Sequence, residues 1–126
     1  MSESTGQPAG GAEFSIDLNE NSASLKIGPD IYLRILSKAM GQTQKDIADL
    51  ETALPVGDFA NVQAIAHRLK GDYDNMRITV LSNIAKEMNE ISKTSQDKDL
   101  LTKRLGDFKK HFTQLQQFIK ARTENG

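Results

Sequence analysis

Three residues within one five-residue stretch of the sequence could carry chemistry: His67, Lys70 and Gly71. An imidazole with an unperturbed pKa of about 6.5 is largely neutral at cellular pH, so a ring nitrogen can attack phosphorus without a separate base. On a helix, Lys70 lies at i+3 from His67 and could bring its ammonium close to a group that the imidazole carries. A side chain larger than glycine at 71 would lean over His67, because helical side chains point toward the N-terminus. The stretch therefore predicts an accessible histidine whose imidazole can act as a nucleophile.

Cations near the histidine matter because phosphoryl transfer passes through a loose transition state whose charge sits on the equatorial oxygens. Lys70 supplies one cation, and Arg68 and Arg77 are candidate neighbours that add to the local field. A lone histidine on a helix is more often an ordinary surface residue. The lysine and the glycine beside it favour the chemical interpretation of His67.

The segments before this stretch must position it, and their apolar residues recur at helical spacing. Residues 1–13, rich in Ser, Gly, Pro and Ala, are predicted to form a disordered tail or linker. Scattered apolar residues within 14–28 allow one short extra helix. Pro29 and Asp30 then open a long amphipathic helix that is predicted to reach about Leu54. Its apolar positions are Ile31, Ile35, Leu36, Ala39, Met40, Ile47, Leu50 and Leu54.

The helix that carries the histidine is predicted to begin near Phe59, with Asp58 as its N-cap. Its buried stripe is predicted to be Val62, Ile65, Ala66 and Leu69. His67 follows Ala66 and lies about 100° further around the helix axis, so we expect its side chain to be at least partly exposed. The helix is expected to fray or turn somewhere within residues 71–76, which are helix-poor.

Two further amphipathic helices complete the predicted fold. The third has apolar positions at Ile78, Leu81, Ile84, Ala85, Met88 and Ile91. The fourth is predicted over residues 97–122, and its apolar positions are Leu101, Leu105, Phe108, Phe112, Leu115 and Ile119. Four such helices with short connections favour an all-α, antiparallel up-and-down four-helix bundle over residues 14–122, followed by a disordered C-terminus at 123–126.

Composition narrows the classes of function. A chain of 126 residues fits one domain, and its net charge of −1 provides no general basic field for nucleic-acid binding. It has no cysteine, which excludes disulfides, thiolate nucleophiles and cysteine zinc sites. No apolar run is long enough to span a membrane, and the first residues lack the pattern of a secretory signal. We therefore expect a cytoplasmic protein that binds neither membrane nor nucleic acid.

Other candidate sites have plainer interpretations. His111 lies between Phe108 and Leu115 on the helical wheel, as a boundary residue would. Two histidines without a shared local spacing give little support for a metal site. Residues 72–75 lack the remaining ligands and the mid-loop glycine of an EF-hand. The basic residues of the last helix favour a solvated charged face, because the aromatic residues there are spaced as core residues.

The sequence Ala-His-Arg-Leu-Lys-Gly at residues 66–71 resembles the signature of histidine phosphotransfer (HPt) domains, single helical bundles that relay phosphoryl groups in signalling systems. The resemblance extends over residues 14–119. It implies that His67 is the phosphorylated histidine, Lys70 the cation next to the phosphate and Gly71 the small residue that keeps the site accessible.

The resemblance also points to one more polar residue and to three departures. Asn89 falls where some members place a polar residue near the histidine. The family usually has small residues just after its glycine and often a second glycine about ten residues after the histidine, whereas this sequence has Asp72, Tyr73 and Arg77 there. Because the signature at His67 is intact, we expect these departures to affect partner choice more than phosphate acceptance.

The resemblance implies that the protein carries a phosphoryl group between aspartates of receiver domains. A sensor or hybrid histidine kinase would supply this group. No intrinsic cofactor or metal is expected, since Mg²⁺ would sit on the partner receiver, and no autokinase activity is expected because no ATP-binding motif is visible. Phe59 and Gln63 are candidate docking residues because they share a helical face with His67. A monomer is expected. The alternatives are a non-catalytic helical interaction module and, less favoured, nucleic-acid binding through the basic last helix.

Overall fold

The computed structural model describes residues 17–125, and over these residues the chain contains helices and turns but no strand. The tail predicted at residues 1–13 lies outside the described residues, as do residues 14–16. The helices are α2 (Leu18–Ser24), α3 (Pro29–Ala53), α4 (Phe59–Asn75), α5 (Thr79–Lys93) and α6 (Lys98–Asn125). The prediction of an all-helical chain is confirmed for the described part, and α2 is the short extra helix that the sequence allowed.

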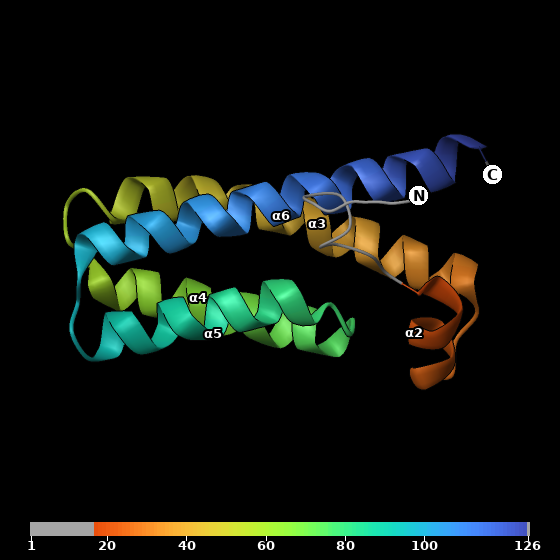
Figure 1. Ribbon diagram of the computed structural model, residues 1–126, viewed down its shortest axis with the longest axis horizontal. Coiled ribbons are helices and arrows are strands. Elements are labelled where there is room, and N and C mark those ends of the chain that lie inside the picture. Colours follow the sequence, from red (N-terminus) through yellow and green to blue (C-terminus); the bar gives the residue numbers. More distant parts are fainter. Residues whose placement is uncertain (1–16, 126) are drawn as a thin grey trace, which may run out of the picture.

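The four long helices surround one hydrophobic core (Figure 1). α4 packs against α5, α5 against α6, and α3 against both α4 and α6. From α3 to α6, successive helices run in opposite directions along the long axis (Figure 1). α3 and α6 extend beyond the other two at the end where α2 packs against α3. The helix that carries His67, α4, therefore has a neighbouring helix on either side.

Local sequence signals set where the helices begin. Asp58 is the N-cap of α4, and its carboxylate accepts a hydrogen bond from the backbone N–H of Asn61 at 3.2 Å, as the sequence predicts. Pro29 opens α3, where its missing N–H costs nothing. The turn before α4 is tight, and Gly57 adopts a φ of +72° there, which glycine tolerates best. Gly57 and Asp58 therefore set where α4 begins.

The inward face of α3 differs from the predicted one at its N-terminal half. Ile31 and Ile35 are 47% and 45% exposed, while Tyr32 and Leu36 are fully buried. The Tyr32 hydroxyl donates a hydrogen bond of 2.5 Å to the backbone carbonyl of Met76, at the end of α4. The buried Tyr32 ring, whose hydroxyl has a hydrogen-bond partner, determines which face of α3 points into the core. A buried tyrosine needs such a partner for its polar atom. The prediction that Ile31 and Ile35 lie on the inward face is wrong for this reason.

The end of α4 falls within residues 71–76, as the sequence predicts. The helix continues to Asn75, and the Tyr73 ring is completely buried. The Tyr73 hydroxyl shares a hydrogen bond of 2.6 Å with Thr43 of α3, and its ring meets Phe108 of α6 edge to face. Tertiary contacts to two neighbouring helices thus hold a segment that has low intrinsic helix propensity.

The C-terminal boundary of the last helix also differs from the predicted one. α6 runs to Asn125, past the predicted end of the bundle at residue 122. Within residues 17–125, no helix combines the length and the apolar character that crossing a membrane requires.

Candidate functional site

The candidate nucleophile His67 lies on the surface of α4 and is exposed, as its helical phase predicts. The residue before it, Ala66, is fully buried in the core, so the backbone at this position is held by packing. Leu69, two residues after His67, is also fully buried. The imidazole thus projects from a rigid helical segment into a region that another molecule can reach.

A groove of about 420 Å³ lies beside the imidazole, between α4 and α5. We call it the α4–α5 groove, and its lining residues are Ala60, Gln63, Ala64, His67, Asn89 and Lys93. The alanines and Gln63 provide an uncharged wall on the α4 side. Asn89 and Lys93 line the α5 side.

Asn89 is the most buried polar residue of this groove. It is 8% exposed, and its Oδ1 atom is buried without a hydrogen-bond partner among the described residues. An unpartnered buried amide oxygen is unfavourable, so its position calls for a hydrogen-bond donor. A neutral imidazole carries one ring N–H that can serve as such a donor. The structure thus brings Asn89, which the sequence suggested only by resemblance, to the same groove as His67.

Lys93 also lines the groove, and nothing in the sequence singled it out. It lies one helical turn after Asn89 on α5, so the two share a helical face. Its Nζ atom is 3.8 Å from Oε2 of Glu90, and its side chain is 46% exposed. The i+4 spacing from Asn89 could have pointed to Lys93 as a site residue. That inference requires knowing which face of α5 packs against α4.

Lys70 does not line the groove. Its Nζ atom contacts Oδ2 of Asp74 at 3.2 Å, one helical turn further from His67. Hydrogen bonding to Ser82 and then to Lys70 holds the pKa of the Asp74 carboxyl below its ordinary value. The lysine therefore has a carboxylate partner in this structure, and its flexible side chain would have to leave that partner to reach a group on the imidazole.

Gly71 leaves open space above the next turn of the helix. A Cβ atom built at this position would have no neighbouring heavy atom within 4 Å. The packing of this chain therefore does not require glycine there, and a helix interior disfavours it by about 1 kcal/mol relative to alanine. That a small residue here keeps His67 accessible, one turn earlier on the same face, stays a prediction.

Both arginines proposed as neighbours of His67 are engaged elsewhere. The Arg68 guanidinium contacts Oδ1 of Asp46 on α3 at 2.5 Å. Arg77 donates to the Ser24 hydroxyl at 3.0 Å and to the Asp74 carbonyl at 3.1 Å. It lies ten residues after His67, about 15 Å along a helix axis. Arg77 is therefore part of the contact between α2 and the end of α4 and does not border the histidine.

The other two departures from the resemblance also need correction or refinement. Tyr73 is a core residue, so it cannot take part in partner choice at the surface. Asp72 is half-buried, and burial together with the charge of Asp46 raises the pKa of its carboxyl, against the opposing effect of Arg68. Among the three departures, only Asp72 is a partly exposed residue of α4.

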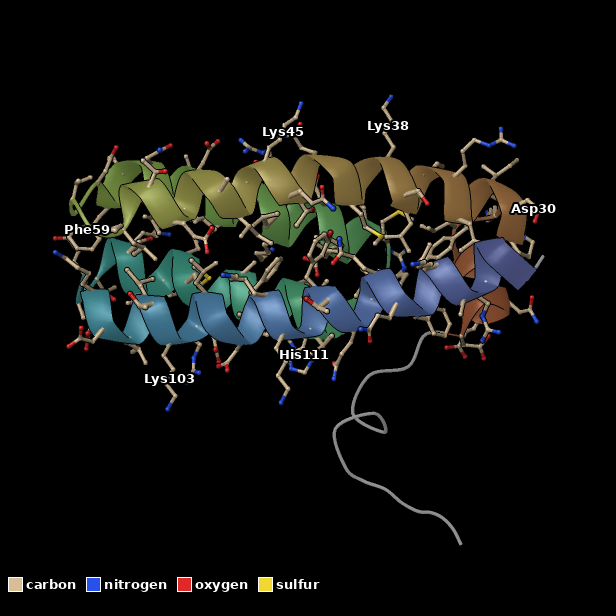
Figure 2. The ribbon with its side chains drawn as sticks, turned by 90° about the horizontal axis from the view of Figure 1, so that it is seen from above. Asp30, Lys38, Lys45, Phe59, Lys103 and His111 are labelled. Atoms are coloured by element: carbon tan, nitrogen blue, oxygen red, sulfur yellow. The ribbon has the colours of Figure 1, made fainter. Side chains whose placement is uncertain are left out.

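The two candidate docking residues are placed differently. Gln63 lines the α4–α5 groove next to His67. Phe59 is half-buried against the core at the first turn of α4, at one end of the bundle (Figure 2). The second histidine, His111, lies on the outer side of α6, where its Nδ1 atom is 3.0 Å from Oε1 of Gln114 (Figure 2). Among the side chains that the structure describes, residues 17–122, no cluster of three or more metal-ligating groups is present.

Comparison with known protein families identifies a family for this chain. The family model described as the Hpt domain matches residues 34–120, which is more than half of the chain and includes the whole α4–α5 groove. No curated protein and no solved structure matches the chain.

Proposed function

The chain belongs to the Hpt domain family, whose members act in histidine phosphotransfer, and from this we propose that it relays a phosphoryl group between receiver-domain aspartates through His67. The single observation that carries the proposal is the exposed imidazole at the rim of a groove, with Asn89 and Lys93 facing it from α5. We further propose that the protein is a carrier without autokinase activity, working as a cytoplasmic monomer.

The transfer step uses the neutral imidazole as the nucleophile. The lone pair of one ring nitrogen forms the new P–N bond while the P–O bond to the receiver aspartate breaks. The aspartate leaves as a carboxylate with the bonding electron pair and needs no proton. The proton on the other ring nitrogen stays on the ring, so the step requires no base from this chain. A second receiver reverses these events when it removes the group.

Each polar residue of the site has a proposed part in this step. Asn89 accepts a hydrogen bond from the ring N–H and so turns the other nitrogen outward, toward the incoming phosphorus. Lys93, across the groove, and Lys70, one turn along α4, supply positive charge to the equatorial oxygens. Gly71 leaves room for the receiver to approach.

The bundle supplies the rigid mount for these groups. We propose that α3–α6 act as an antiparallel up-and-down bundle in which α4 and α5 present the site and α3 and α6 support it from behind. Gln63, and at greater distance Phe59, would contact the receiver beside the imidazole. Mg²⁺ would be held by the acidic pocket of the receiver and not by this chain.

The test is a transfer assay with a phosphorylated receiver domain. We expect the protein to acquire a phosphoryl group that is labile in acid and stable in base, as a P–N bond to histidine is. His67→Gln should abolish the label, whereas His111→Gln, which removes the other histidine, should retain it. Binding of the receiver without any labelling would instead identify a non-catalytic interaction module, and a label that persists in His67→Gln would refute the assignment.

A further inference from the structure

We propose that Glu90 and Asp74 pair with Lys93 and Lys70 while His67 carries no phosphoryl group. After phosphorylation these carboxylates compete with the phosphoryl group for the two lysines, which lowers the equilibrium occupancy of phosphohistidine. This inference rests on the proposed function. Glu90 and Asp74 are positioning residues, since each acts only through its lysine. Their effect is to keep the phosphohistidine ready to pass its phosphoryl group on.

The first counter-ion pair connects two surfaces of α5. Lys93 lines the α4–α5 groove, while Glu90 lines a separate groove of about 560 Å³ between α5 and α6. Their charged atoms are 3.8 Å apart, and both side chains are about half exposed. Lys93 thus stands between two negative groups once His67 is phosphorylated: the phosphoryl group in one groove and Glu90 at the edge of the other.

The second pair repeats this arrangement along α4. Lys70 lies three residues after His67 and four residues before Asp74, so one turn of helix separates it from each. Its Nζ atom contacts Asp74 at 3.2 Å. Helical geometry allows the lysine to reach either residue, so it must leave Asp74 to reach a group on His67.

The charges favour the exchange, and its cost is small. A phosphoryl group on a side chain carries about −1.5 to −2 charges and three acceptor oxygens, against one charge for a carboxylate. Each lysine should therefore move to the phosphoryl group. Breaking an exposed ion pair costs little, so each counter-ion should reduce the equilibrium occupancy of phosphohistidine by about two- to fivefold.

The test measures this equilibrium without a partner protein. The full chain is incubated with phosphoramidate in an ammonium buffer, where the P–N bond of the donor breaks, ammonia leaves and a new P–N bond forms on the imidazole. Because ammonium is present, the reverse reaction restores the donor, and ³¹P NMR gives the equilibrium constant. We expect Glu90→Gln and Asp74→Asn each to shift it about two- to fivefold toward phosphohistidine. Both changes are isosteric and at exposed positions.

Glu87→Gln is the matched control. Glu87 lies on α5 one turn from Glu90, has the same exposed fraction of 58% and pairs with Arg104, not with a site lysine. It changes the net charge by the same amount, so it should leave the equilibrium within about 1.5-fold of that of the unaltered protein. In a Lys93→Ala background, Glu90→Gln should lose its effect, because the effect operates through Lys93.

The outcomes separate this inference from the proposed function. An unaltered protein that phosphoramidate cannot label at His67 would refute the proposed function and this inference with it. A labelled protein in which Glu90→Gln and Glu87→Gln behave alike would refute the inference alone. So would an effect of Glu90→Gln that persists in the Lys93→Ala background, since it would then reflect general charge.

Discussion

The Arg68 guanidinium, on the residue next to the candidate nucleophile, reaches across to α3 and contacts the carboxylate of Asp46 at 2.5 Å. Asp46 is completely buried, and its Oδ1 atom also accepts a hydrogen bond from Gln42 at 3.2 Å. Its Oδ2 atom has no partner among the described residues. Arg68 therefore supplies the charge that makes burial of this carboxylate tolerable, and it ties the back of the site helix to α3.

Arg68→Gln should consequently destabilise the fold. Removal of the guanidinium leaves a buried carboxylate without a counter-charge, and we expect the free energy of unfolding to fall by about 2 kcal/mol, since the arginine itself is half exposed. Urea unfolding followed by circular dichroism measures it. Arg34→Gln, at an exposed position of α3, should change it by less than about 0.5 kcal/mol. Addition of Asp46→Leu to Arg68→Gln should recover most of the loss, and failure to do so would show that the pair is not the cause.

The buried Tyr73 predicts a loss of stability in alkali. Burial, with smaller contributions from the charges of Asp72 and Asp46, raises the pKa of its phenol above the ordinary value of 10.0, while the hydrogen bond with Thr43 opposes the shift. The folded state therefore holds this proton more tightly than the unfolded state does. Stability from this group is complete below about pH 10 and declines as the pH rises further, because the unfolded chain then releases the proton.

Tyr73→Phe tests this pH dependence. Near neutral pH the variant should be about 1 kcal/mol less stable, because it lacks the hydrogen bond of 2.6 Å to Thr43. Above about pH 10 the difference between the two proteins should shrink, because phenylalanine has no proton to release. Urea unfolding at a series of pH values measures both effects. A difference that stays constant up to about pH 11 would contradict the assignment.

Asn89→Ala should separate activity from stability. Its buried Oδ1 has no partner among the described residues, so its removal should not lower the free energy of unfolding by more than about 1 kcal/mol. Loss of the group that orients the imidazole should slow labelling of His67 about tenfold. Asn83→Ala, also on α5 but exposed, is the control and should label at the normal rate. Equal labelling rates in the two variants would remove Asn89 from the site.

The position of His67 could be predicted from the sequence because it depends on one helix alone. Asp58 fixes where α4 begins, and the buried residues Ala66 and Leu69 fix its phase. Helix capping and the period of the apolar residues are local properties. The positions of His67, Lys70 and Gly71 along the helix could therefore be predicted without knowledge of the other helices.

The other side of the site depends on how two helices meet, and this is not a local property. Which α5 residues face His67 follows from the packing of α4 on α5, so Lys93 could not be identified and Asn89 was suggested only by resemblance. The partners of Arg68 and Arg77 likewise depend on α3 and α2. Charge near a histidine in the sequence is therefore a poor guide to charge near it in space.

Gly71→Ala should stabilise the fold and impair transfer from a partner. A Cβ atom there would meet no heavy atom within 4 Å, so alanine should add about 1 kcal/mol through helix propensity. Gly106→Ala is the matched control, because Gly106 is in α6 and its Cβ would also meet nothing within 4 Å. Both variants should gain stability in thermal unfolding. Transfer from a phosphorylated receiver should fall about tenfold only in Gly71→Ala, where the methyl group would meet the docked receiver beside His67. Labelling by phosphoramidate, which is small enough to avoid the methyl group, should be nearly unchanged in both variants. An equal loss with both donors would mean that alanine disturbs the imidazole itself and not the approach of the partner.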